Sequence, residues 1–428
     1  MSLSNHKLLV LVSFLFISFV FLFFSEATGS HELILLASLF ISSTAMYNTR
    51  KNLYIFLLSF FVFLFPFDYS IGYFSGFSLY PFYRFENMAM VFFCISVFSS
   101  ILSSLNVQSP NLIYELGLSE NFEFVNGRLV LWSLMCLSLI MLIAIKGQVS
   151  IFSGGDSYST YQDNLRSGSG IIEYTLMVFL VCLFYKKNKT EKTILTIIVF
   201  IYIIKTILFG FRVQALVAII ILSVLLLKKY PSSKFNFGIC FSGFLIMIVY
   251  GVIKEGVSIF DGDIGFNILL DTRYGYVQSH QHGVLSSSSI ILAYDNDEIS
   301  KVLYWPAALI AAFLPRRVIN DELGFMYPSA YVQFFDYTPG GGFFLVQILS
   351  LLGPIGVAFI SIFLFYILNS FSRNVNLKGP LLIAAICLLC FFPRWVSYDF
   401  LNFGIRTIFI VLGLVYLPCL LRMAKRAY

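Results

Sequence analysis

The sequence predicts an all-α polytopic membrane protein with about twelve transmembrane helices. Of its 428 residues, 59% are hydrophobic and 12% are charged, whereas about 25% of the residues of a soluble domain are charged. A soluble protein must cover itself with polar groups, so this composition excludes a soluble enzyme, a disordered chain and a nucleic-acid-binding module. The apolar residues form long unbroken runs rather than alternating strands, which excludes a β-barrel.

The second observation is the length of these runs, since a spanning helix needs roughly 20 apolar residues. The runs that come close to this length are 8–24, 31–47, 52–66, 86–105, 128–145, 170–185, 192–209, 212–227, 235–253, 343–369, 379–393 and 403–421. The first run lacks a small-residue cleavage site, so we expect a retained helix. Within 192–227, Gly210 and Phe211 predict a tight hairpin, because one helix of that length would overshoot the bilayer.

The third observation is the placement of Lys and Arg. With the N-terminus inside, 16 of the 28 lie in inner segments, 11 lie outside and Lys205 lies within a span. This excess of Lys and Arg on the inner side follows the positive-inside rule. The distribution of basic residues therefore indicates the orientation of the chain in the membrane and not nucleic-acid binding. It predicts both chain ends in the cytoplasm.

These spans divide the chain into three parts. Residues 1–253 hold nine helices and an outer loop at 146–169, residues 254–342 form a large outer loop, and residues 343–428 hold the last three helices. Loops of this length are usually functional. Within it, 284–294 and 302–314 are apolar but too short to span, so we expect re-entrant or interfacial helices that roof a cavity.

Eight of the 11 outer basic residues are Arg. Arg binds phosphate through a planar fork of donors, so we predict that Arg212, Arg273, Arg316 and Arg317 bind a diphosphate. Arg166 is a candidate for contact with a saccharide or a second phosphate. The alternative is that some of these Arg lie among lipid headgroups. Fixed guanidiniums would stabilise the charge that a leaving diphosphate develops, and a cell exterior offers only lipid-linked activated sugars.

Transfer to a sugar hydroxyl also needs a base. His280, His282 and Glu322 compete for this role, because His titrates near working pH and a carboxylate can be tuned towards it. Tyr274, Trp305 and Tyr327 are candidates for stacking on sugars, although an interfacial aromatic belt would use the same residue types. The two His lack partners at metal-ligand spacing, so no metal is expected.

Two more charged groups and the cysteines have simpler interpretations. Arg394 and Asp399 flank an outer turn, and we expect them to be structural. Lys205 either snorkels to the outer headgroups or is functional. The seven Cys fall in or beside apolar runs, which predicts no disulfide framework, and Cys387 and Cys390 are expected to pack rather than to carry redox or metal chemistry.

The layout resembles the O-antigen polymerase (Wzy-type) family over essentially the whole chain. Local similarities are Asn164–Gly170 before the sixth span, Gly210-Phe211-Arg212 at the eighth, and Pro328-Ser329-Ala330, Gln347 and Leu352–Val357 around the tenth. Val213 and Gln214 follow Arg212, where the family usually has a small residue.

This resemblance implies a GT-C-like glycosyltransferase of the bacterial inner membrane with its large loop in the periplasm. It would join oligosaccharide repeat units carried on undecaprenyl diphosphate by passing the growing glycan to the non-reducing end of an incoming unit, without metal or nucleotide. Membrane lipids, a flippase and a chain-length regulator would be its partners. The alternatives are an O-antigen ligase, a lipid-linked oligosaccharide flippase and a structural scaffold.

Overall fold

The computed structural model describes residues 5–74, 84–107, 127–149, 157–227, 232–254, 279–293, 341–372 and 379–427. Within these ranges the regular elements are helices, and no strand is present. The all-α prediction is therefore confirmed for the part of the chain that the structure describes.

Each of the twelve predicted spans lies on a helix. The helices on which they lie are α1 (Asn5–Thr28), α2 (Glu32–Thr49), α3 (Leu53–Phe74), α4 (Met88–Ser104), α5 (Gly127–Ala144), α6 (Ser157–Leu183), α7 (Lys189–Leu208), α8 (Arg212–Leu226), α9 (Ser233–Lys254), α15 (Phe344–Ser372), α16 (Pro380–Trp395) and α17 (Arg406–Ala427).

Five described segments are both long and apolar enough to cross a membrane. They are His6–Thr28, Leu53–Phe74, Phe85–Ser104, Gly127–Ala144 and Phe344–Ser372. These segments indicate a membrane protein. The spanning role of the other seven helices stays a prediction.

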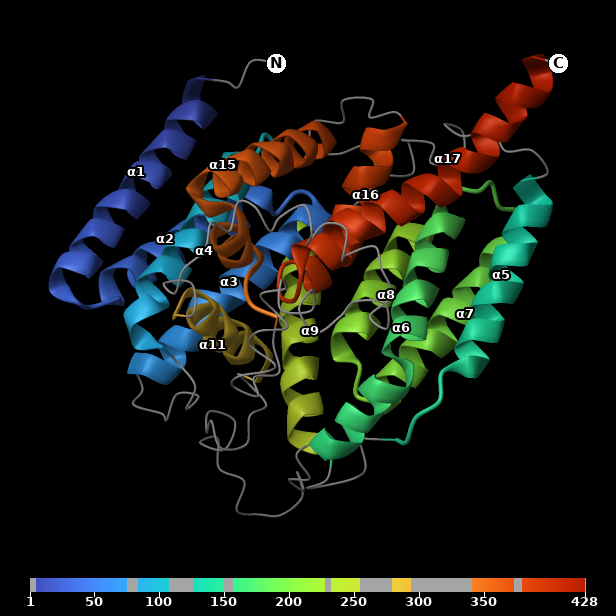
Figure 1. The fold of residues 1–428 in the computed structure, drawn as a ribbon, viewed down its shortest axis with the longest axis horizontal. Coiled ribbons are helices and arrows are strands. Elements are labelled where there is room, and N and C mark those ends of the chain that lie inside the picture. The colour runs from blue at the N-terminus through green and yellow to red at the C-terminus, as the bar shows by residue number, and fades with distance from the viewer. Residues whose placement is uncertain are drawn as a thin grey trace.

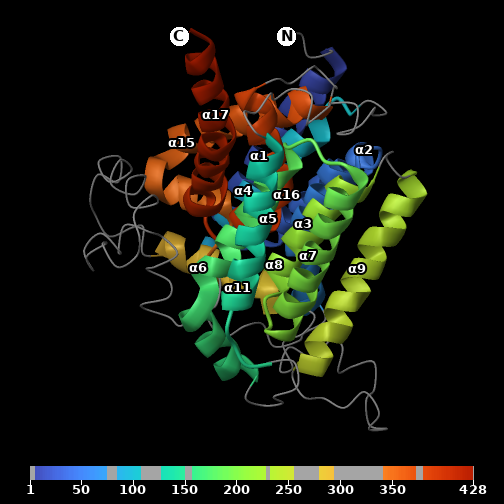
Figure 2. The ribbon, with the colours of Figure 1, turned by 90° about the vertical axis from the view of Figure 1, so that its right-hand side faces the viewer.

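The helices form two groups that α16 connects. Helices α1 to α4 pack on one another, and α5 to α8 form the second group. Helix α16 contacts both α3 and α8, and α17 packs on α16 and α6, as Figure 1 shows. Both termini lie at the same end of the bundle (Figures 1 and 2). A bundle that places its termini in this way agrees with an even number of crossings.

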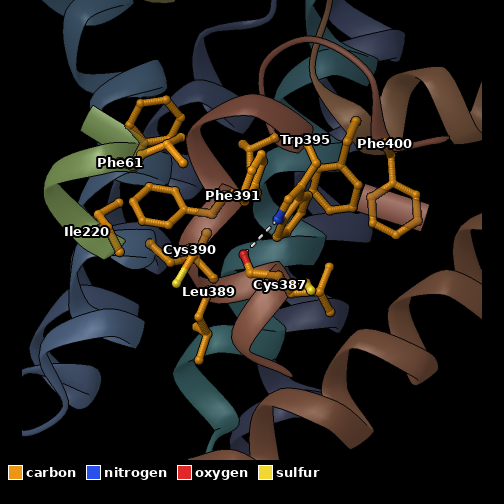
Figure 3. Packing of buried hydrophobic residues seen from close by; sticks show 14 of the residues in the cluster. Phe61, Ile220, Cys387, Leu389, Cys390, Phe391, Trp395 and Phe400 are labelled. Carbon is orange, nitrogen blue, oxygen red and sulfur yellow. Dashed lines mark hydrogen bonds between the residues drawn. The ribbon is translucent and has the colours of Figure 1, made fainter. Parts of the chain in front are cut away.

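The core is densest around α16, where every residue from Leu382 to Trp395 is buried. A helix that is apolar on all sides is expected in an interior position. Trp395 packs against aromatic neighbours such as Phe400, and its indole N–H donates to the Leu388 carbonyl at 2.8 Å (Figure 3). Cys387 and Cys390 are free and buried in the same cluster, so the packing interpretation is confirmed.

The predicted hairpin between α7 and α8 is confirmed. Gly210 has φ +87°, a conformation that suits glycine because it has no Cβ. The Phe211 N–H donates to the Thr206 carbonyl at 2.8 Å and the Gly210 N–H to the Ile207 carbonyl at 3.1 Å. These bonds close the end of α7 and place Arg212 at the first position of α8.

Helix α15 is helical over its predicted span but is not continuous. Gly353 has φ +64° and ψ −168°, and Pro354 follows it. Proline lacks an N–H and excludes the helical conformation of the residue before it. The helix therefore consists of a buried first half and a second half in which Ile355 is 84% exposed.

One helix comes from the predicted large outer loop. Helix α11 (Ser279–Ala293) covers most of the predicted segment 284–294 and packs against α3, α4 and α15, at the end of the bundle away from the termini (Figures 1 and 2). Ser286 to Ser289 are buried, and the hydroxyls of Ser288 and Ser289 have partners. The Ser288 hydroxyl donates to the Val284 carbonyl and accepts from the Phe343 N–H, both at 2.7 Å. The loop thus contributes a buried helix to the bundle.

Candidate functional site

A buried cluster of charged and amide side chains lies between α6, α8 and α16. We call it the Arg394 cluster, and it consists of Glu173, Gln214 and Arg394. The Arg394 Nη2 lies 2.8 Å from Glu173 Oε1, and the Gln214 amide donates to the same oxygen at 3.0 Å. The three residues come from distant parts of the sequence, so the tertiary fold creates this cluster.

Neighbouring aromatic groups support the guanidinium and the carboxylate. The Arg394 guanidinium lies 4.3 Å from the centre of the Tyr398 ring and 4.1 Å from that of Phe403. Such cation–π contacts stabilise a cation more when it is desolvated. On the other side, the buried Tyr202 hydroxyl donates to the Ile172 carbonyl at 3.1 Å, which holds the backbone next to Glu173.

The pair is buried without being fully satisfied. The side chains of Arg394 and Glu173 are each 10% exposed. Among the described residues, Arg394 Nε and Glu173 Oε2 have no hydrogen-bond partner. A buried pair of charges offsets its desolvation only when its remaining hydrogen bonds are also made. The open positions on this ion pair therefore indicate partners that are still to be bound.

The turn after α16 connects this cluster to α11 and α15. Gln347 in α15 donates to the carbonyls of Gly341, Gly342 and Tyr398, the last at 2.5 Å. The His280 Nε2 of α11 lies 3.2 Å from the Ser397 hydroxyl. The turn that carries Ser397 and Tyr398 is thus held from two sides.

His280 lies within electrostatic reach of two guanidiniums. Burial is the main cause that lowers its pKa to about 3, and the positive charges of Arg212 and Arg394 lower it further. The predicted diphosphate ligand Arg212 therefore acts electrostatically on the predicted base His280. At neutral pH the imidazole is uncharged, and a group with so low a pKa is a weak proton acceptor. Its position fits a hydrogen-bonding role better than the predicted role of base.

His282 points to a different set of residues. Its Nε2 lies 3.4 Å from the Asp68 backbone carbonyl, so this nitrogen carries the hydrogen. Burial lowers the pKa of His282 to about 4, with the Asp68 hydrogen bond opposing that shift. Its ring lies next to Tyr69, whose hydroxyl is 2.7 Å from His31 Nε2. His282 belongs to a polar group on α2 and α3.

Asp68 lies in the same region and was not singled out in the sequence. It is fully buried in α3, and neither carboxylate oxygen has a hydrogen-bond partner among the described residues. An isolated carboxylate inside a protein costs several kcal/mol unless it is neutralised or paired. An ionisable residue at such a position defaults to a functional hypothesis.

The remaining predicted site residues divide into two sets. Arg166 lies in α6, because that helix begins at Ser157 and takes in the second half of the predicted loop 146–169. The helix can extend into this segment because each residue added to an existing helix gains a hydrogen bond at low cost. The residues that lie outside the described residues are Arg273, Tyr274, Trp305, Arg316, Arg317, Glu322 and Tyr327.

The structure favours a structural role for Lys205 and a functional role for Arg394. The Lys205 amine donates to the Leu142 carbonyl at 2.7 Å, which favours a structural role. Arg394, expected to be structural, is the centre of the buried cluster. Glu173 was not singled out in the sequence, and Gln214 was noted only as a departure from the family pattern after Arg212. The available signal was that Glu173 and Arg394 are opposite charges inside apolar runs.

The described residues contain no group of three or more His, Cys, Asp or Glu side chains that could hold a metal ion. No protein-family model matches the chain, and searches of curated proteins and of solved structures find no similar protein. What the protein does must therefore be inferred from its residues and their arrangement.

Proposed function

We propose that the protein is a bacterial inner-membrane glycosyltransferase that polymerises oligosaccharide repeat units carried on undecaprenyl diphosphate. The single observation that carries this proposal is that Arg212 and Arg394, from two separate helices, both act electrostatically on His280 of helix α11, while Arg394 is held 2.8 Å from Glu173. Two guanidiniums at one place are the groups that a diphosphate requires.

The proposed reaction takes place on the periplasmic face. A hydroxyl at the non-reducing end of the incoming unit attacks the anomeric carbon of the growing glycan, and the bond from that carbon to the diphosphate breaks. Guanidiniums fixed in a poorly solvated site stabilise the charge on the departing diphosphate. The proton of the hydroxyl passes to a base, for which Glu322 stays a candidate, because the low pKa of His282, like that of His280, makes it a weak proton acceptor. No metal or nucleotide takes part in this scheme.

A flippase for the same lipid-linked units is a second candidate that two observations favour. Intramembrane acids mark ion and substrate pathways, and Asp68 is a fully buried acid. Broken helices are common in transporters, and α15 is broken at Gly353. An O-antigen ligase, which passes the glycan to lipid A core, would use the same lipid-linked donor.

The experiment that separates these functions is a lipopolysaccharide gel from a deletion strain, run beside the strain complemented with the wild-type gene. Core carrying a single repeat unit, with the ladder restored on complementation, supports the polymerase. Bare core with accumulated lipid-linked polymer indicates a ligase. Bare core with single units facing the cytoplasm indicates a flippase. An unchanged ladder contradicts all three for this glycan.

The role of arginine is tested in the same strain. Arg212→Ala and Arg273→Ala are expected to abolish polymer while the protein stays in the membrane, because each removes a fixed positive charge from the proposed diphosphate site. Immunoblots of the membrane fraction give the protein level. Wild-type polymer length in both variants would exclude the diphosphate assignment.

A further inference from the structure

Among the described residues, two buried Glu side chains pair with Arg, and in one of these pairs every carboxylate oxygen has a partner. In the first, Glu191 Oε1 accepts from Arg128 Nε at 2.8 Å and from the Trp132 indole at 3.2 Å. Glu191 Oε2 accepts from the Asn188 N–H at 2.9 Å, within the capping box that begins α7. Both carboxylate oxygens have partners, and the Arg128 side chain is 73% exposed. This pair has the properties of a structural contact.

The Glu173–Arg394 pair differs from it in each of these respects. Both of its side chains are buried, and the two charges meet through Glu173 Oε1 alone at 2.8 Å. Glu173 Oε2 and Arg394 Nε lack partners among the described residues. Glu173 Oε2 can only accept a hydrogen bond from a donor, and Arg394 Nε can only donate one to an acceptor.

The chemistry of a matching ligand follows from these two open positions. It must present an acceptor, best an anionic oxygen, to the guanidinium, and beside it a hydroxyl that donates to the carboxylate. Inorganic phosphate satisfies Arg394 alone and is repelled by Glu173, whereas a neutral sugar satisfies Glu173 alone. The rings of Tyr398 and Phe403 lie against the guanidinium, so an edge that carries Nε is left for hydrogen bonding. A sugar phosphate offers both groups next to each other.

We infer that Glu173 and Arg394 form a subsite for a glycosyl phosphate, in which Arg394 binds a phosphate oxygen and Glu173 binds a hydroxyl of the attached sugar. Gln214 is a positioning residue, because its amide holds Glu173 Oε1. The chemical class of the ligand follows from the two side chains. Its attachment to a lipid rests on the proposed function.

The test measures binding of three probes to the full chain, purified and placed in lipid nanodiscs. The first probe is farnesyl diphospho-N-acetylglucosamine, the second is farnesyl diphosphate, and the third is octyl glucoside. The wild-type protein is expected to bind the first probe at least about 10-fold more tightly than the second, which is the usual effect of one hydrogen bond to a charged group. Octyl glucoside is expected to bind more weakly than either diphosphate.

The variant Glu173→Gln separates the two parts of the subsite. Its amide oxygen still accepts from Gln214 and Arg394, but the atom that replaces Oε2 can no longer accept from a sugar hydroxyl. Its preference for the sugar-bearing probe is expected to fall to about one, with binding of farnesyl diphosphate retained. Arg394→Gln is expected to weaken both diphosphate probes about 10-fold or more.

Two controls keep the inference falsifiable. Glu191→Gln alters the structural pair and is expected to leave all three affinities unchanged. The double variant Glu173→Gln/Arg394→Gln leaves no unpaired charge, so its folding does not depend on the ion pair, and it is expected to lose both the affinity and the preference.

A wild-type protein that does not distinguish the first two probes would overturn the subsite, and so would a Glu173→Gln protein that keeps the preference. Polymerisation is read separately from the lipopolysaccharide gel. Preferential binding of the sugar-bearing probe by a protein whose deletion leaves the ladder unchanged would support the subsite and contradict the polymerase.

Discussion

Removing one partner of the Glu173–Arg394 pair is expected to destabilise the protein far more than neutralising both. Arg394→Gln leaves a buried carboxylate and Glu173→Gln leaves a buried guanidinium. Breaking a buried pair in this way costs about 3–5 kcal/mol, whereas replacing both charges is close to neutral. The pair qualifies because both side chains are 10% exposed and their atoms lie 2.8 Å apart.

The magnitude is best obtained from a double-mutant cycle. Suppose that each single variant loses about 3 kcal/mol of unfolding free energy and the double variant about 1 kcal/mol. The interaction energy is the sum of the two single losses minus the loss in the double variant, or roughly 5 kcal/mol. Reversible denaturation by SDS in mixed micelles, followed by tryptophan fluorescence, gives the free energy of unfolding for each variant. Trp395 reports directly on this region, since it is fully buried and next to Arg394.

Two results would refute this reasoning. An interaction energy below about 0.5 kcal/mol is the range of an exposed ion pair, and it would show that the pair is solvated. A strong decrease of the interaction with added salt would show the same, because buried charges are screened much less than surface charges. Glu191→Gln, Arg128→Gln and their double variant provide a matched cycle on a pair that is exposed on one side.

Three further predictions concern other parts of the structure. In Gly341→Ala the new Cβ would meet the Tyr398 backbone, so we expect loss of stability by about 1–3 kcal/mol and lower polymer yield, read from melting curves and gels. Hydrogen bonds, first from Asn188, keep the pKa of Glu191 below its usual value. Its contribution to stability is therefore present above the unfolded pKa and is lost as pH falls through the lower folded value, and Glu191→Gln should flatten that part of a stability-against-pH curve. Because burial and two Arg hold the pKa of His280 near 3, His280→Gln should leave the pH dependence of polymerisation between pH 5 and 8 unchanged, and loss of an inflection near 6.5 in that variant would contradict it.

Much of the helical framework could be predicted from the sequence, because it depends on local properties. The apolar runs placed a helix on each predicted span, and Gly210 marked the hairpin before Arg212. The start of α6 was missed because Ser157–Gly170 is polar and contains glycine, which are also the features of a loop. Propensity is a weak guide when a helix extends from an apolar segment that is already helical.

The candidate site could be predicted only in part, since its central contacts join distant segments. The residue types pointed to Arg212 and His280, and in the structure the charge of Arg212 lowers the pKa of His280. Arg394 looked like one of two charges at a turn, and nothing local to it indicates Glu173 as its partner. The burial of Asp68 likewise depends on helices that pack against α3 from elsewhere in the chain. Pairing inside a bundle is decided by packing rather than by spacing along the sequence.

Because α15 is broken at Gly353, the side-chain directions in its first half do not depend on those in its second half. In a continuous helix, one inserted residue turns every later side chain by about 100°. At Gly353 the backbone leaves the helical conformation, so such a rotation ends there and does not reach the first half. The first half carries Gln347, which bonds to the turn beside Arg394. An insertion or deletion in the second half therefore does not rotate Gln347. A change of length there would disturb contacts of the second half itself, such as that of Asn369 Oδ1 with the Asn106 N–H at 3.3 Å, while the geometry of the cluster stays the same.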